Sequence, residues 1–445
     1  MRDAKCTREH MNQRDTLFVK DGQLNICSFK ATDLAGKFGT PLYVMDGNYI
    51  EEVCLHMIEA VKSYGDGAVA YASKAFATIA TTKLMNKLGM WFDAVSGGEL
   101  YLLRSAGVDP KRIIFHGNAK TVQEIVEGVE SGVGLFVIDS TSEIDRLDKI
   151  AGERGAKQDV LIRINPLVSA HTHTAVQTAA PMSKFGFDIQ GNAIDYIKDI
   201  ISRQNLCFKG LHIHIGSQIY DHSAYEIAVD KIAELVRKLH DEGIDVDVVD
   251  LGGGYGVYYF GNDPKFTPSR YAYTIKNLLF YFDICLRERG LGKPFVIIEP
   301  GRSIVGEAGV TLYTVNAIKN FEGVKKYVAI DGGMFENPRH ALYGSQYTAV
   351  VCNKADMPKT DVVTIAGKCC ESGDVISTDV PLQKAEVGDV VAVFTTGAYN
   401  YSMASNYNLN PVPPVVLVKD DQAELIVKGQ SYEDMLRNNI VPEWI

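Results

Sequence analysis

Two patterns of hydrophobic and polar positions divide the chain at about residue 305. Before that point, continuous apolar runs alternate with stretches in which apolar residues recur at helical spacing. The apolar runs are the eight strand candidates 68–73, 89–95, 112–116, 135–139, 159–165, 208–215, 245–251 and 295–299. The helical stretches between them include 121–132, 141–154, 223–242 and 268–290. Runs rich in Val, Ile, Leu and Phe without a polar face are typical of parallel strands buried on both faces.

The number and spacing of these units indicate a closed fold. Eight strand–helix units over about 235 residues match the usual span of a (β/α)8 barrel, which is roughly 250 residues. We therefore predict a TIM-like (β/α)8 barrel over residues 36–305. A doubly wound open sheet is the structural alternative, but eight regular units favour closure.

The second pattern begins after residue 305, where the apolar runs become short and β-branched. Gly, Pro, Asp and Asn separate them, and the runs are 309–318, 325–331, 346–352, 361–366, 389–395, 413–418 and 422–428. This pattern predicts an antiparallel β domain, a sandwich or barrel, over residues 306–445. An Asp21-Gly22 turn between apolar runs predicts a hairpin, and we expect the strands of residues 15–35 to join this second domain.

Composition limits the class of protein. The chain has 445 residues, of which 46% are hydrophobic and 22% charged, as in a soluble enzyme of two domains. Its net charge of −10 argues against a nucleic-acid or anionic-membrane partner, and no run approaches the length of a membrane span. Residues 1–14 are polar and mixed in charge, which predicts a disordered lead-in rather than a signal peptide. We expect a small-molecule substrate.

The cysteines favour a reducing compartment. There are eight, and their spacing fits neither a disulfide framework nor a CxxC zinc site. Cys54, Cys207 and Cys285 lie in apolar runs, where cysteine is usually a small core residue. The sequence therefore predicts a cytoplasmic protein.

Candidate chemistry gathers at the ends of the predicted barrel strands, where a barrel places its active site. In chain order these ends carry Lys74, Ser96, His116 with Asn118, Asp139, Asn165, His214, Gly252–Gly254 and Glu299. Lys74 supplies an amine for a Schiff base, and His214 supplies a ring that can stack on another ring. The glycine amides suit a phosphate, and the Glu299 carboxylate suits a pyridinium nitrogen. Together these groups describe pyridoxal phosphate.

Each of these residues also has a purely structural explanation. A lysine at a strand end is more often solvated, and a glycine cluster is usually just a tight turn. His212-Ile213-His214 could be an ordinary alternating pair or a metal-binding HxH. Metal binding needs further ligands, and none stands at a clear metal spacing, so we predict no metal. The glycine cluster follows the seventh strand, where many barrels bind phosphate and where only glycine lets the backbone approach closely.

The second domain carries three further candidates. Gly367–Asp374, with adjacent cysteines and three polar residues, predicts a loop in which Cys370 could donate a proton beside an acid. Arg339 and Tyr343 are four residues apart and could share one helix face, with Arg339 clamping a carboxylate. Tyr399 lies in a turn that is not specific by itself.

In combination, these segments resemble the fold-type III pyridoxal-phosphate decarboxylases, most closely those that act on diaminopimelate. The similarity runs from about residue 16 to residue 445. The motifs that carry it are YASKAF (71–76), DAVSGGEL (93–100), FHGNAK (115–120), RINP with HTH and SKFG (163–186), LHIHIGSQI (211–219), LGGGYG (251–256), EPGRS (299–303), NPRHALYG (337–344), CESGD (370–374) and GAYNYSMASNYN (397–408).

The resemblance implies a role for each candidate. Lys74 would form the Schiff base, His214 would stack on the cofactor ring, and Glu299 would pair with the pyridine nitrogen. The segments that would bind the phosphate contain Ser217, Gly252, Gly253, Gly254, Gly301 and Arg302. The residues that would hold the substrate are Arg302, Arg339, Tyr343, Glu371 and Tyr399, of which Tyr399 would touch cofactor or substrate. Cys370 would protonate the carbanion. Cys370 and Glu371 would be contributed across a homodimer interface, so a monomer should be inactive.

The reaction that the resemblance implies is the conversion of meso-2,6-diaminoheptanedioate to L-lysine and CO2, the last step of lysine biosynthesis. The main alternative is a decarboxylase of the same fold acting on ornithine, lysine, arginine or carboxynorspermidine. The NPRHALYG segment favours a substrate with a distal carboxylate. A metal-dependent barrel hydrolase using His212 and His214 is a second alternative. A regulatory homologue without chemistry is a third, but it would not need the proton donor Cys370.

Overall fold

The computed structural model describes residues 14–168 and 183–445. The lead-in predicted for residues 1–14 therefore lies outside the described residues except for Arg14, and so does the HTH sequence at 171–173. The chain forms two compact units. Of the described residues, the barrel unit comprises 51–168, 183–256 and 266–303, and the sheet unit comprises 14–50, 257–265 and 304–445.

The barrel unit is a closed ring of parallel strands, as the sequence predicted. Its eight strands are β5 (Gly67–Ala72), β6 (Trp91–Ala94), β7 (Ile113–Phe115), β8 (Leu135–Ile138), β9 (Gln158–Asn165), β11 (Leu206–Ile213), β12 (Val248–Asp250) and β13 (Phe295–Ile298). Each strand pairs with the next, and β13 pairs with β5 to close the ring. The open-sheet alternative is therefore wrong. A two-residue strand, β10 (Phe187–Asp188), adds a short parallel pair to β9.

Successive side chains of a barrel strand lie alternately inside and outside the ring, and both sets are buried. Ala68 and Ala70 of β5, with Leu135 and Val137 of β8, belong to one buried cluster that also holds residues of β7, β9 and β13. The intervening residues, such as Val69, are also buried. Both faces of the strands are therefore buried, which explains why their sequences are apolar throughout.

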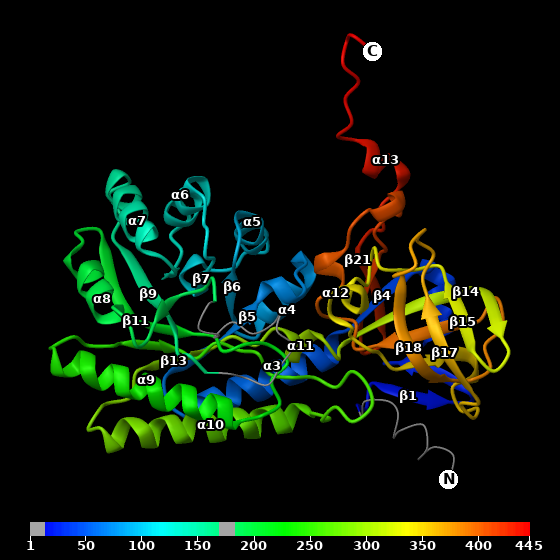
Figure 1. Ribbon diagram of the computed structural model, residues 1–445, viewed down its shortest axis with the longest axis horizontal. Coiled ribbons are helices and arrows are strands. Elements are labelled where there is room, and N and C mark those ends of the chain that lie inside the picture. Colours follow the sequence, from blue (N-terminus) through cyan, green and yellow to red (C-terminus); the bar gives the residue numbers. More distant parts are fainter. Residues whose placement is uncertain (1–13, 169–182) are drawn as a thin grey trace. The chain divides into compact units, whose positions relative to one another are not determined.

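Helices alternate with the barrel strands and lie on the outside of the ring (Figure 1). They are α3 (Gly47–Lys62), α4 (Ile79–Lys87), α5 (Gly97–Ser105), α6 (Val122–Ser131), α7 (Thr141–Glu153), α8 (Ala193–Ser202), α9 (Ser223–Asp241) and α10 (Pro268–Glu288). The short α11 (Arg302–Val305), which follows β13, is buried. Local signals set their ends. Helix α6 begins with a capping box between Thr121 and Glu124 and ends at Gly132, which has φ +71°.

The sheet unit is built on a mostly antiparallel sheet in the order β18-β17-β15-β14-β4-β20-β21, with β19 also paired to β14 and β16 paired to β19. Its strands are β4 (Leu42–Asp46), β14 (Gly309–Phe321), β15 (Lys325–Ile330), β16 (Ala349–Val351), β17 (Asp361–Ala366), β18 (Val375–Leu382), β19 (Val390–Phe394), β20 (Val415–Lys419) and β21 (Gln422–Val427). Two short helices, α12 (Arg339–Tyr343) and α13 (Tyr432–Leu436), complete it.

Two strands of this sheet differ from the prediction. Residues 36–50 were assigned to the barrel, but β4 pairs with β14 on one side and β20 on the other. All five residues of β4 are buried, so its apolar sequence does not distinguish it from a strand of the barrel. Strand β18 was not predicted, because polar Ser, Thr and Asp interrupt its apolar residues.

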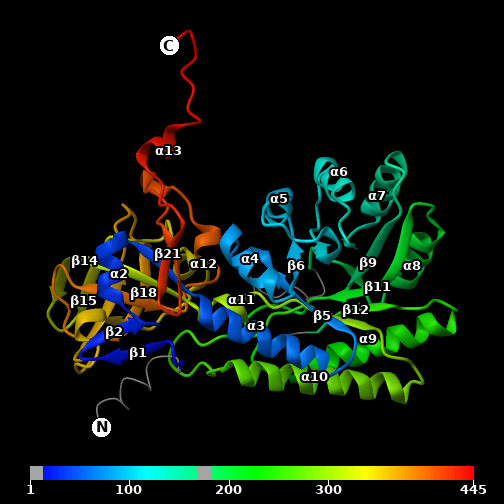
Figure 2. The ribbon, with the colours of Figure 1, turned by 180° about the vertical axis from the view of Figure 1, so that it is seen from behind.

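The predicted N-terminal hairpin is present. Strands β1 (Leu17–Lys20) and β2 (Gln23–Ile26) are joined at Asp21 and Gly22, which both have positive φ, and β3 (Phe29–Lys30) extends them into a three-stranded sheet of its own. Helix α2 (Ala31–Phe38) lies beside β2 (Figure 2). The hairpin joins the sheet unit by packing rather than by strand pairing, since Leu24 and Ile26 share a core with Leu312.

No helix in the described ranges has the length and apolar character that crossing a bilayer requires.

A buried ion pair links the loop after β7 to the first turn of helix α7. The Lys120 ammonium donates to Glu143 Oε1 at 2.6 Å and to the carbonyls of Gly117 and Val137, and both charged side chains are at most 2% exposed. Glu143 also accepts the N–H of Asp139. The pair therefore fixes the loop after β7 against the loop after β8.

We expect Lys120→Met to lower the free energy of unfolding by about 3–5 kcal/mol, because it leaves the Glu143 carboxylate buried without its cation. Lys149→Met is the matched control, since Lys149 pairs with Glu153 at 3.8 Å on the surface with 76% of its side chain exposed. That variant should change stability by less than about 0.5 kcal/mol. Denaturant unfolding measures both, and equal losses would contradict the role given to the buried pair.

Candidate active site

Lys74 stands directly after strand β5, in a single 3-10 turn at Ser73–Ala75. Its ammonium lies 3.5 Å from Asp93 Oδ2 of β6; the Lys74 side chain is 42% exposed, and the Asp93 side chain only 2%. The amine is therefore half-buried at the end of the barrel strands, with a buried carboxylate beneath it. This position leaves the amine accessible to a molecule bound at that end.

His214 follows strand β11 and lies close enough to Lys74 for the Lys74 charge to lower its pKa. The N–H of Gly253 donates to His214 Nδ1 over 3.4 Å. Burial, together with the charges of Lys74 and Arg163, holds the pKa of His214 well below its usual value. The ring is therefore neutral, with its Nδ1 acting as an acceptor, and it presents an uncharged aromatic face.

The glycine cluster after strand β12 forms a cradle of backbone. A Cβ on Gly252, Gly253 or Gly254 would lie 2.4, 2.0 or 2.1 Å from a backbone oxygen of a neighbouring loop, and Gly252 and Gly254 have positive φ. A Cβ on Gly301 would meet Ala72 at 2.9 Å. Only glycine fits at these positions, so the backbones of these loops approach one another more closely than any side chain would allow.

A basic side chain borders this cradle. Arg302 is buried and donates from Nη2 to Ser217 Oγ at 3.0 Å. Backbone amides, a hydroxyl and a guanidinium are the groups that bind phosphate in proteins. The loops after β11, β12 and β13 therefore have the chemistry of a phosphate site.

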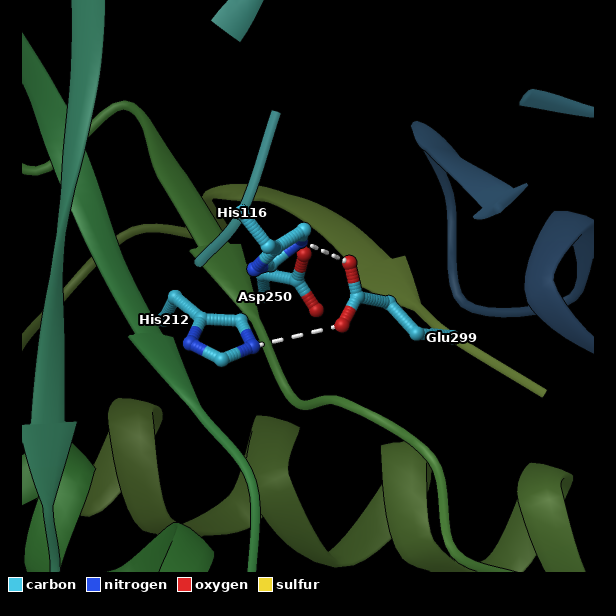
Figure 3. A group of neighbouring side chains, drawn as sticks. All are labelled: His116, His212, Asp250 and Glu299. Carbon is cyan, nitrogen blue, oxygen red and sulfur yellow. Dashed lines mark hydrogen bonds and ion pairs between the residues drawn. The ribbon is translucent and has the colours of Figure 1, made fainter. Parts of the chain in front are cut away.

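Glu299, directly after strand β13, is the centre of a buried polar group (Figure 3). Its Oε1 lies 2.6 Å from His116 Nε2 and its Oε2 lies 3.2 Å from His212 Nε2. Burial opposes the charge of Glu299, but the two histidines outweigh it and hold the pKa of Glu299 well below its usual value. Burial lowers the pKa of His212 to about 3, so His212 is neutral and donates from Nε2.

The same group contains four side chains of metal-ligating type, which the sequence did not predict. His116, His212, Asp250 and Glu299 each offer one atom within 4.8 Å of the others. Each lies in or directly after a different barrel strand, so no local spacing relates them. His214 does not belong to this group, so the group does not contain both histidines of the HxH motif. The histidines hydrogen-bond to Glu299, which accounts for the convergence of these three side chains without an ion, and Asp250 lies beside them.

The sequence analysis did not single out three buried ionisable residues inside the barrel strands: Asp93, Arg163 and Asp250. Each lies within an apolar barrel strand. A charged residue inside a strand buried on both faces is itself the signal that could have found them, because such a charge needs a partner or a ligand. Nearby Glu99 has its pKa raised to about 7 by burial and by the charge of Asp93.

Arg339 and Tyr343 lie on one turn of helix in the sheet unit, as their spacing predicted. The Arg339 guanidinium lies 5.6 Å from the Tyr343 ring and 5.2 Å from the Tyr259 ring, and it donates to Tyr347 Oη and Ser345 Oγ, both at 3.1 Å. The Arg339 side chain is buried, and Tyr399 lies close enough to help raise the pKa of its guanidinium.

No carboxylate pairs with Arg339 among the residues that the structure describes. A buried guanidinium held by hydroxyls and aromatic rings retains a strong preference for an anion. The sheet unit therefore contains a site suited to a carboxylate.

Cys370 and Glu371 lie in the turn between β17 and β18, the loop that the sequence predicted. Cys370 is exposed and its N–H donates to Asn408 Oδ1 at 2.8 Å, whereas Cys369 is buried. Tyr407, which the sequence analysis did not single out, donates its hydroxyl to Glu371 Oε2 at 2.8 Å. The thiol of Cys370 and the carboxylate of Glu371 are thus presented on the surface of this unit.

The comparisons with known proteins agree with this chemistry. Residues 50–306 match the family described as "Pyridoxal-dependent decarboxylase, pyridoxal binding domain". The diaminopimelate decarboxylase of Halalkalibacterium halodurans is 43% identical over 94% of this chain and 95% of its own length, and that of Bacillus subtilis is 42% identical over the same shares. The chain belongs to the diaminopimelate decarboxylase family.

Solved structures of the family give the same fold. The diaminopimelate decarboxylase of Methanocaldococcus jannaschii, in a complex with L-lysine, has a TM-score of 0.88 and 40% identity over 96% of this chain and 98% of its own. The family is pyridoxal-dependent. Pyridoxal phosphate is therefore the cofactor, and the half-buried amine, neutral ring, glycine cradle and buried carboxylate of the barrel unit fit it.

We expect Gly253→Ala to weaken the binding of pyridoxal phosphate at least about tenfold, because its Cβ would lie 2.0 Å from the Glu299 carbonyl and displace the cradle. Gly292→Ala is the control, since a Cβ there meets nothing within 4 Å. Titration of the apoprotein with the cofactor, followed by tyrosine and tryptophan fluorescence, measures both affinities. Wild-type affinity in Gly253→Ala would show that the loop does not approach the cofactor.

Proposed function

We propose that this protein decarboxylates meso-2,6-diaminoheptanedioate to L-lysine and CO2 with pyridoxal phosphate. The observation that carries the proposal is the near full-length similarity to diaminopimelate decarboxylases, including one solved with L-lysine, the product of this reaction. The buried Arg339, which lacks a carboxylate partner in the described part of the chain, supports a substrate with a second carboxylate.

In this proposal the barrel unit holds the cofactor. Lys74 binds it covalently through its amine, His214 stacks on its ring, and Glu299 pairs with its ring nitrogen. Gly252, Gly253, Gly254, Ser217, Gly301 and Arg302 bind its phosphate. When bound, the cofactor supplies an electron sink for the charge that remains when the carboxylate leaves as CO2.

The remaining residues act on the substrate. Arg302, Arg339, Tyr343, Glu371 and Tyr399 bind its charged ends. Arg339 and Glu371 meet the distal carboxylate and amine, respectively, so a substrate without that end would leave both charges unpaired, at a cost of about 2–5 kcal/mol each. The Cys370 thiol donates its proton to the carbon from which CO2 departs, and the Lys74 amine then takes part in product release.

We further propose that the active form is a homodimer in a reducing cytoplasm. The exposure of Cys370 supports contribution of this loop, with Glu371, to the active site of a second copy. The described cysteines are free thiols, which suits a reducing compartment. A monomeric variant should then bind the cofactor but fail to turn over substrate.

The experiment that tests the proposed function is CO2 release by purified protein with pyridoxal phosphate. We expect release from meso-diaminopimelate, with an equal amount of L-lysine, and none above background from L-lysine, L-ornithine, L-arginine or carboxynorspermidine. Lys74→Ala should lose turnover and the visible absorbance of the bound cofactor. Release from another of these amino acids would favour the alternative decarboxylases, and a near wild-type rate in Lys74→Ala would refute the covalent role.

We expect Arg339→Ala to raise KM for diaminopimelate by roughly 30-fold or more, because the distal carboxylate loses a buried cation. Lys384→Ala, which removes an exposed cation of the same unit, should leave KM within about twofold. Steady-state kinetics with direct CO2 detection compares the two. An unchanged KM in Arg339→Ala would remove Arg339 from the substrate site.

A further inference from the structure

Among the described residues, one carboxyl group at the core of the barrel has no cation paired with it. Lys74 pairs with Asp93, and Arg163 pairs with Asp139 at 3.8 Å. Asp250, which is fully buried, has no ion pair with a described cation. An isolated buried carboxylate is costly, and in such sites the group usually takes up a proton instead.

Asp250 is placed against a second carboxylate. Its Oδ1 accepts the N–H of Gly252 at 2.9 Å, while its Oδ2 has no hydrogen-bond partner among the described residues. Figure 3 shows the Asp250 carboxyl group pointing toward that of Glu299. One oxygen of each carboxyl group lies within 4.8 Å of the other, and two like charges that close in a buried site repel strongly, which favours protonation of one of them.

The surrounding donors decide which one holds the proton. Glu299 faces two imidazole nitrogens, His116 Nε2 and His212 Nε2, whereas Asp250 accepts a single backbone amide. Donors stabilise the charged form of a carboxylate, so the charge resides on Glu299. Burial and the charge of Glu299 accordingly raise the pKa of Asp250 well above its usual value. Asp93 adds a further negative charge near Asp250, and the positive charge of Arg163 acts on both carboxyl groups. His214 also faces Glu299, and Tyr255 faces Asp250.

We infer that Asp250 is a neutral carboxylic acid in the native enzyme and that it acts with His212 as a positioning residue for Glu299. The inference rests on the proposed role of Glu299 toward the ring nitrogen of the cofactor. The Asp250 proton and the His212 Nε2–H keep one negative charge on Glu299. Glu299 can then hold the ring nitrogen protonated, which strengthens the ring as an electron sink.

The first test detects the Asp250 proton directly, by infrared spectroscopy of the apoprotein at neutral pH. We expect a carboxylic acid C=O band that Asp250→Asn removes, while bands from other protonated acids, such as buried Glu336, remain in the variant. An unchanged carboxylic acid region in Asp250→Asn would overturn the inference. This measurement needs neither cofactor nor substrate, so it does not depend on the proposed function.

The second test compares two replacements of Asp250 in the complex with pyridoxal phosphate. Asn has the shape and neutrality of the protonated acid, and it retains an acceptor for Gly252 and a donor toward Glu299. Asp250→Asn should keep the cofactor affinity within about threefold and preserve its visible spectrum, whereas Asp250→Leu should weaken binding at least about tenfold. A spectral change in Asp250→Asn equal to that of Glu299→Gln would show that Asp250 carries a charge.

The third test concerns His212. His212→Leu removes the donor to Glu299, so we expect the cofactor spectrum to shift toward that of Glu299→Gln, with kcat lowered about tenfold or more and KM little changed. His212→Gln can donate from a similar position and should restore most of the spectrum. Equal spectra and equal kcat in the two variants would leave His212 a structural residue only.

The same four side chains could instead bind a divalent cation, and this outcome is distinguishable. Metal analysis of the purified holoenzyme should give less than about one-tenth of an ion per chain, and chelator treatment should leave the cofactor spectrum unchanged. A stoichiometric ion that Asp250→Asn removes would overturn the inference. Failure of the wild-type protein to bind pyridoxal phosphate would instead refute the proposed function.

Discussion

The closure of the barrel is the constraint on which the rest of the structure depends. Because β13 pairs with β5, every barrel strand has two neighbours and two buried faces. Polar chemistry is then restricted to the carboxyl ends of the strands and to a few charges within them. Apart from Tyr399 of the sheet unit, the candidate cofactor residues follow such ends, in loops brought together only by the ring.

Burial at these strand ends sets the protonation of each group. It keeps His214 and His212 neutral, and it makes the charge of Glu299 depend on the donors around it. Removal from water strengthens each remaining electrostatic contact. One physical effect, desolvation, therefore yields an uncharged ring beside the amine and an ionised carboxylate deeper in the barrel.

In the sheet unit, one candidate residue is buried and stays charged, and two others lie on the surface. Arg339 remains charged because hydroxyls and aromatic rings surround it, while Cys370 and Glu371 are presented on an exposed turn. The first arrangement suits tight recognition of one anion. The second suits groups that act on a molecule bound elsewhere, as the proposed sharing of sites between two copies requires.

The sequence by itself determined the barrel, its eight strands and the second β domain, because each local period reflects the burial of its own element. It also determined the candidate residues at strand ends and in the β17–β18 turn, since residue type and local position suffice there. It misassigned β4, whose apolar residues do not record which sheet they enter. Only the tertiary structure decided the contacts between Asp250, Glu299, His116 and His212. These residues lie on different strands, so no local pattern relates them, and their charges depend on desolvation and neighbours that exist only once the ring has closed.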